Sequence, residues 1–109
     1  MQLRDMSADQ ILEVFEKRQD AYADAYEVEG DEKSRHEALS TGLYEAFRKD
    51  DKLSIEDAKR YLWTIETFRD SDKWHRQAQA DALRARMGME RAKIALDLWR
   101  TEAANLRKI

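Results

Sequence analysis

The chain has 109 residues, of which 39% are charged and 42% hydrophobic, and its formal net charge is −3. It is too apolar for a disordered tail, and its length is typical of a single domain. It contains no proline, no cysteine and three glycines. The shortage of turn-forming residues favours an all-α fold. The lack of cysteine excludes disulfides and thiolate metal ligands or nucleophiles.

Charge and hydropathy are distributed unevenly along the chain. Residues 1–58 hold 8 Lys and Arg against 16 Asp and Glu, whereas residues 59–109 hold 12 against 7. This polarity indicates either two halves that attract each other or one end offered to a charged partner. No run of about 18 apolar residues occurs, so we expect no signal peptide, no membrane contact and a cytoplasmic location.

The first predicted helix spans about residues 8–29. Ser7 and Gln10 have the spacing of a capping box, and Gly30 is expected to end the helix. Apolar side chains recur at helical intervals between these signals, at Ile11, Phe15, Tyr22 and Tyr26. A second set with steps of three and four predicts an acidic ridge on the same helix: Asp9, Glu13, Glu16, Asp20, Asp24 and Glu27.

Three further helices are predicted, at about 32–49, 55–69 and 72–108. The first of them is expected to begin near Asp31 or Ser34, where Ser34 and Glu37 have the spacing of a capping box, and Ser54 is expected to cap the second. Ser71 or Asp72 could cap the last, although the helix from 55 could also continue into it without a break. A helix over 72–108 would be about 55 Å long at ~1.5 Å per residue. We therefore expect it to protrude from the other helices or to lie against a second copy.

This last helix has two apolar faces. One follows the alternating steps of a coiled-coil seam and is rich in alanine: Ala78, Ala82, Ala85, Met89, Ala92, Leu96, Trp99, Ala103 and Leu106. The other lies at positions that normally face water: Leu83, Met87, Ile94 and Leu98. The predicted fold is a three- to four-helix bundle whose long C-terminal helix forms the seam. The second face predicts an interface with another chain, and the alternative is a central helix wrapped on both sides in a monomeric bundle.

Basic residues beside the seam repeat every seven positions and form a basic ridge: Arg86, Lys93, Arg100 and Arg107. Its simplest role is to meet the acidic ridge, either within the chain or across a dimer. The alternative is that this ridge, with Arg84 and Arg91, contacts an anionic partner such as a phosphate backbone. The acidic pI of about 5.4 argues against nucleic acid as the main partner.

No catalytic, metal or cofactor site is predicted. The histidines His36 and His75 fall on different predicted helices with no second ligand at metal-binding spacing, so we interpret them as surface residues. The serines occupy positions where helices could begin, which uses their hydroxyls as caps rather than nucleophiles. Trp74 is a candidate interface anchor, with capping of the bundle end as the alternative.

The sequence therefore predicts a non-enzymatic helical protein: an adaptor, regulator or inhibitor, of the kind frequent in phages and mobile elements, that binds a protein partner. It is expected to form a homo-oligomer, with a dimer favoured. The predicted interface residues are Leu83, Met87, Met89, Ile94, Leu96, Leu98, Trp99 and Leu106. The alternative function is a nucleic-acid-associated accessory protein in recombination or packaging.

Overall fold

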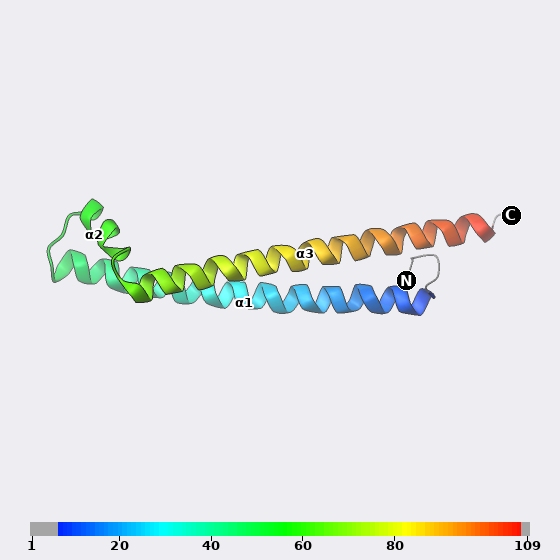
Figure 1. Ribbon diagram of the computed structural model, residues 1–109, viewed down its shortest axis with the longest axis horizontal. Coiled ribbons are helices and arrows are strands. Elements are labelled where there is room, and N and C mark those ends of the chain that lie inside the picture. Colours follow the sequence, from blue (N-terminus) through cyan, green and yellow to red (C-terminus); the bar gives the residue numbers. More distant parts are fainter. Residues whose placement is uncertain (1–6, 108–109) are drawn as a thin grey trace. The chain divides into compact units, whose positions relative to one another are not determined.

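The computed structural model describes residues 7–107 and forms three α-helices in this range. Helix α1 spans Ala8–Lys49, α2 spans Ile55–Leu62 and α3 spans Glu66–Arg107 (Figure 1). No strand occurs in this range. The all-α prediction is confirmed, whereas the bundle and the coiled-coil seam stay predictions.

Helix α1 is one continuous helix of 42 residues where the sequence predicted two, at 8–29 and 32–49. Gly30 does not end it, because its φ is not positive and it continues the helical backbone. A glycine inside a helix costs only about 1 kcal/mol relative to alanine, whereas a new helix needs a new nucleus. Ser34, predicted as a cap, lies in mid-helix. Ser7 is the cap as predicted: its Oγ accepts a hydrogen bond from the Gln10 backbone N–H at 3.2 Å, and Gln10 Oε1 accepts one from the Ser7 N–H.

Helix α2 is short and begins at its predicted cap. The Ser54 side chain accepts a hydrogen bond from the Asp57 N–H at 3.2 Å. The predicted C-terminal end of this helix, at residue 69, is wrong: the helix ends at Leu62, because the chain turns at residues 63–65. Thr64 Oγ1 donates to the Tyr61 carbonyl there at 2.6 Å, and the Trp63 N–H reaches the Arg60 carbonyl.

Helix α3 begins at Glu66 rather than at residue 72, so it passes through Ser71 and Asp72 without a break. The residue before it is Ile65, which has no capping side chain, and this explains why no start signal was visible there. Its predicted end at residue 108 lies outside the described residues.

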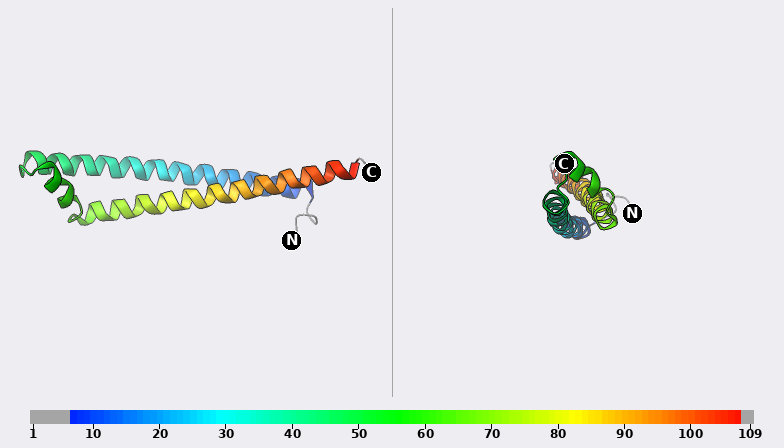
Figure 2. Two further views of the ribbon diagram at one scale, coloured as in Figure 1. Left: turned by 90° about the horizontal axis from the view of Figure 1, so that it is seen from above. Right: turned by 90° about the vertical axis from the view of Figure 1, so that its left-hand side faces the viewer.

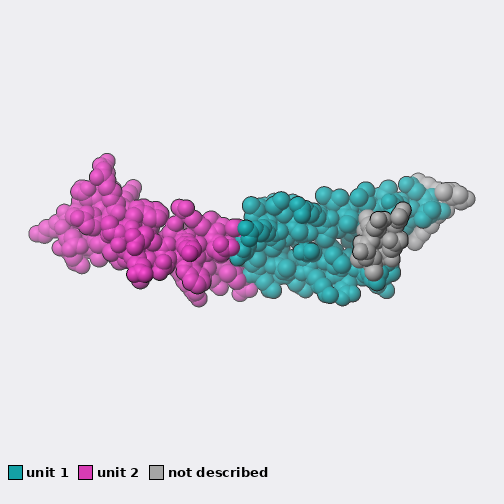
Figure 3. All heavy atoms as spheres, in the orientation of Figure 1, with its two compact units in different colours: residues 1–25, 81–109 teal, residues 26–80 magenta. Residues whose placement is uncertain are grey.

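Two compact units divide the chain, drawn in different colours in Figure 3. Unit 1 comprises residues 1–25 and 81–109, and unit 2 comprises residues 26–80. Within each unit, α1 and α3 run antiparallel, and in unit 2 α2 connects the end of α1 to the start of α3 (Figures 1 and 2). The core of unit 1 holds Ile11, Ala82 and Leu96, and that of unit 2 holds Ala58, Leu62, Phe68 and Ala78.

Candidate interaction site

The inner face of α3 in unit 1 packs against α1. The predicted seam positions on this face are buried or half-buried: Ala82, Ala85, Met89, Ala92, Leu96, Trp99 and Ala103. Only 6% of the Leu96 surface is exposed. Three of the predicted interface residues, Met89, Leu96 and Trp99, are therefore used within the chain. Leu106, the last seam position, is exposed.

The outer face of α3 in unit 1 carries a row of exposed apolar side chains, which we call the outer stripe. Its members and their exposed fractions are Leu83 (58%), Met87 (46%), Ile94 (59%) and Leu98 (53%). They lie on one helix face because their spacings of four, seven and four residues follow the helical repeat. No part of the described chain covers them, and this is the geometry expected of an interface.

The basic ridge lies beside the outer stripe. Arg86, Lys93 and Arg100 are exposed, and Arg86 Nε donates to Glu90 Oε1 of the next turn at 3.1 Å. Lys93 and Arg100 make no ion pair with residues 7–107. Arg107 is the last residue of α3, and its side chain falls outside what the structure describes.

The acidic ridge of α1 is also exposed along its length. Glu13 pairs with Lys17 of the same helix at 3.0 Å. Among the described residues, no ion pair joins this ridge to the basic ridge of α3. The intramolecular pairing that the sequence left open is not seen, and both ridges keep charge for other partners.

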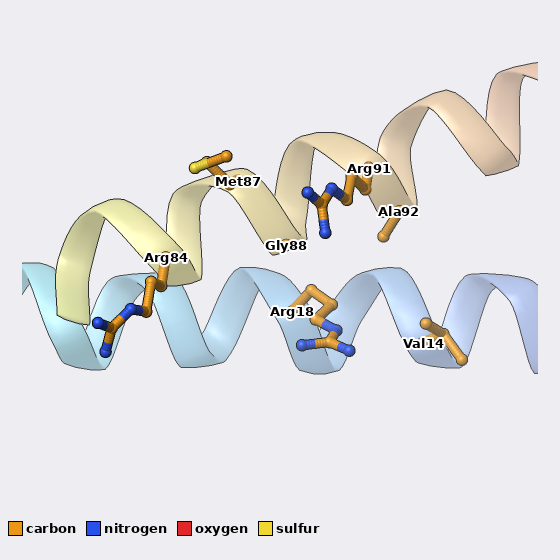
Figure 4. Close-up of a pocket in the computed structure, with 7 residues that line it drawn as sticks. All are labelled: Val14, Arg18, Arg84, Met87, Gly88, Arg91 and Ala92. Carbon is orange, nitrogen blue, oxygen red and sulfur yellow. The ribbon is translucent and has the colours of Figure 1, made fainter. Parts of the chain in front are cut away.

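A cleft of about 440 Å³ opens between α1 and α3 in unit 1 (Figure 4). Three arginines line it, Arg18 on α1 and Arg84 and Arg91 on α3. The other lining residues are Val14, Met87, Gly88 and Ala92, so no carboxylate is among them. We call this the arginine cleft. The sequence had placed Arg84 and Arg91 among candidate contacts for an anionic partner, but it had not singled out Arg18.

The two histidines come together in unit 2, which corrects their interpretation as unrelated surface residues. The ring centroids of His36 and His75 are 5.8 Å apart. Nδ1 of His36 is hydrogen-bonded to Ser71 Oγ at 2.9 Å, and its Nε2 lies 3.6 Å from Asp72 Oδ1. His75 Nε2 is buried with no hydrogen-bond partner. Ser71 thus acts inside the helix packing instead of capping a helix.

Asp72 is held from its other side by Arg76, whose Nε lies 3.0 Å from Asp72 Oδ2. Within residues 7–107, no group of three or more histidine or carboxylate side chains is arranged to hold a metal ion. The histidine cluster is therefore a polar layer within the packing of unit 2, with no ligand set for a metal.

Trp74 lies on α3 in unit 2, with 65% of its surface exposed. It borders a shallow cavity lined by Asp70, Lys73 and Gln77 of the same helix. The part of the chain that the structure describes also has no helix apolar and long enough to cross a membrane.

Comparison with known proteins adds no relative. The chain matches no known protein family, and no curated protein or solved structure is detectably similar to it. Function must therefore be argued from the outer stripe, the two ridges and the arginine cleft.

Proposed function

We propose that this protein is a non-enzymatic helical interaction protein that self-associates through the outer stripe of α3. The observation that carries the proposal is the exposure of Leu83, Met87, Ile94 and Leu98 along one face of a single helix. Fully burying a side chain of this kind stabilises a complex by roughly 1.5–3 kcal/mol relative to leaving it in water.

The occupant we propose for the outer stripe is α1 of a second copy. The basic ridge flanks the stripe, and the acidic ridge of α1 has no ion-pair partner among the described side chains of α3 in its own chain. A two-fold axis would set the acidic ridge of each copy against the basic ridge of the other. The same contact between the two ridges would therefore form twice in the dimer. The charges would select the partner and its orientation, and the apolar stripe would supply most of the stability.

The role that follows from this architecture is an adaptor, regulator or inhibitor that occupies a surface of another protein. Phages and mobile elements encode many small helical proteins that work in this way, and we include such an origin and a cytoplasmic location in the proposal. In this proposal the dimer presents unit 2, with the exposed Trp74, to the partner. A large exposed aromatic side chain is the type of residue that dominates binding energy at interfaces.

Light scattering on the purified chain tests self-association. We expect a mass of twice the 12.9 kDa of one chain. The double substitution Leu83→Ser with Ile94→Ser should give a folded monomer, because both side chains are exposed within the chain. Val28→Ser is the matched control, since Val28 is 52% exposed but lies in unit 2. A monomeric parent protein would end the proposal, as would equal dissociation by the control.

A second candidate function is association with nucleic acid, favoured by the exposed and unpaired Lys93 and Arg100. A gel shift at low salt tests it, because phosphate contacts strengthen as salt falls. Retardation that is lost when Arg86, Lys93 and Arg100 are changed to alanine would support it. If the parent protein does not retard the nucleic-acid probe, this function is excluded.

A further inference from the structure

Arg18 occupies a position on α1 where an apolar residue is expected. Residues 11, 15, 18, 22 and 25 of α1 follow the steps of four and three of one helix face. Ile11, Phe15, Tyr22 and Ala25 are buried or half-buried, whereas Arg18, the charged member of the series, is exposed. Its side chain is therefore available to a ligand at the edge of the packed face.

Gly88 lies opposite Arg18 on α3. A Cβ atom at Gly88 would come 3.4 Å from the nearest guanidinium nitrogen of Arg18 and 3.7 Å from its Cδ. These are ordinary contact distances, so the fold could accommodate alanine at this position. The glycine makes the helix less stable than that alanine would.

Gly88, which is a poor helix former, therefore faces Arg18 across α1 and α3. Local departures from the residues that would best stabilise a fold are expected where a site requires them. Here the absent Cβ leaves more room beside the Arg18 guanidinium. That space is the arginine cleft, with Arg84 and Arg91 on its α3 side (Figure 4).

The guanidinium groups of the cleft are short of negative partners. Arg18 and Arg91 make no ion pair with any residue in the described range. Arg84 lies 3.6 Å from Asp81, in an exposed pair one turn apart on α3. Such exposed pairs contribute little free energy, so Asp81 is a weak competitor for a ligand.

We propose that the arginine cleft binds a dianionic phosphate monoester group carried on a small apolar body. Each guanidinium presents a planar fork of N–H donors, and three of them exceed what the two oxygens of a carboxylate can accept. A phosphate monoester offers three acceptor oxygens and a charge of about −1.5 to −2 at pH 7. Val14 and Ala92 supply an apolar floor for the group that carries it. The site lies within one chain, so it does not depend on self-association.

Calorimetric titration of the full chain at low salt tests the proposal with phenyl phosphate, inorganic phosphate and benzoate as probes. Phenyl phosphate is expected to bind more tightly than inorganic phosphate, because of the apolar floor, and more tightly than benzoate, because of the third oxygen and second charge. Equal or tighter binding of benzoate would overturn the assignment. A phosphodiester oligonucleotide that binds more tightly than phenyl phosphate would also overturn it, if Arg100→Ala weakens oligonucleotide binding as much as Arg18→Met does.

Variants separate the site from the fold. Arg18→Met should weaken phenyl phosphate binding about tenfold or more, the scale of a lost charge-assisted hydrogen bond, while the protein stays folded. Gly88→Ala should raise thermal stability and weaken binding, because the new methyl group takes up space in the cleft beside the Arg18 guanidinium.

The matched control is Gly42→Ala, in α1 of unit 2, where no atom lies within 4 Å of an added Cβ. It should bring the same gain in helix stability and leave binding unchanged. Unchanged affinity in Arg18→Met, or an equal loss in Gly42→Ala, would contradict the proposal. The folded monomeric variant with Leu83→Ser and Ile94→Ser should bind phenyl phosphate like the parent. This comparison separates failure of the cleft from failure of the dimer.

Discussion

The ring centroids of His36 and His75 lie 5.8 Å apart in unit 2, with the ring planes tilted by 31°, and the two side chains differ in hydrogen bonding. His36 is hydrogen-bonded to Ser71, whereas Nε2 of His75 is buried without a partner. A buried polar atom with no hydrogen bond costs about 1–3 kcal/mol, because it has lost its water. The histidine pair is thus a local weakness in the packing of unit 2.

We predict that His75→Leu stabilises the protein by about 1 kcal/mol, because it removes this unsatisfied nitrogen and keeps a side chain of similar size. His36→Leu is the matched comparison and should lower the free energy of unfolding by about 1 kcal/mol, since it leaves Ser71 Oγ without its partner. Urea denaturation measures both. The opposite ranking of the two variants would show that the unsatisfied atom is wrongly assigned.

Two serines that both resemble helix caps in the sequence should respond differently to alanine. Ser54→Ala should destabilise the protein by about 1 kcal/mol, because Ser54 accepts the Asp57 N–H at the start of α2. Ser34→Ala should be neutral or slightly stabilising, since Ser34 is exposed in the middle of α1 and alanine is the better helix former. Thermal melting followed by circular dichroism distinguishes them. Equal destabilisation would mean that a helix starts at Ser34 after all.

A charged residue substituted on the inner face of α3 should affect folding, whereas one substituted on the outer face should affect only self-association. Leu96→Asp places a carboxylate in the core of unit 1 and should cost about 3 kcal/mol or more, which is enough to unfold a small domain. Leu98→Asp, two residues away on the outer stripe, should leave the helical content unchanged and disrupt only self-association. Circular dichroism and light scattering on both variants check this. Loss of helix in Leu98→Asp would contradict the assignment of the outer face.

Much of the fold was accessible from the sequence, because helix formation is local. The absence of proline, the Ser7 and Ser54 caps and the two-faced last helix all follow from residues within a few turns of one another. The continuity of α1 was missed because its apolar pattern fails around Gly30. The positions that pack there are Glu29, Glu32 and His36, which are half-buried although polar.

The candidate site could be predicted only in part from the sequence, for a different physical reason. Which residues of α1 face which residues of α3 depends on where the chain reverses between them, and no local pattern fixes that register. The encounters of Arg18 with Gly88 and of His36 with His75 therefore appear only in the folded chain. One signal did exist: Arg18 falls on the regular steps of four and three that link Ile11 to Ala25, and it is the charged residue in that series.

The central claim is that a second copy covers the outer stripe. The most direct measurement is an isotope-filtered nuclear Overhauser experiment on a mixture of carbon-13-labelled and unlabelled protein, which detects only contacts between copies. We predict intermolecular contacts from the methyl groups of Leu83, Ile94 and Leu98 to protons of α1. A spectrum in which these methyl groups contact no second chain, from a sample at millimolar concentration, would contradict the account.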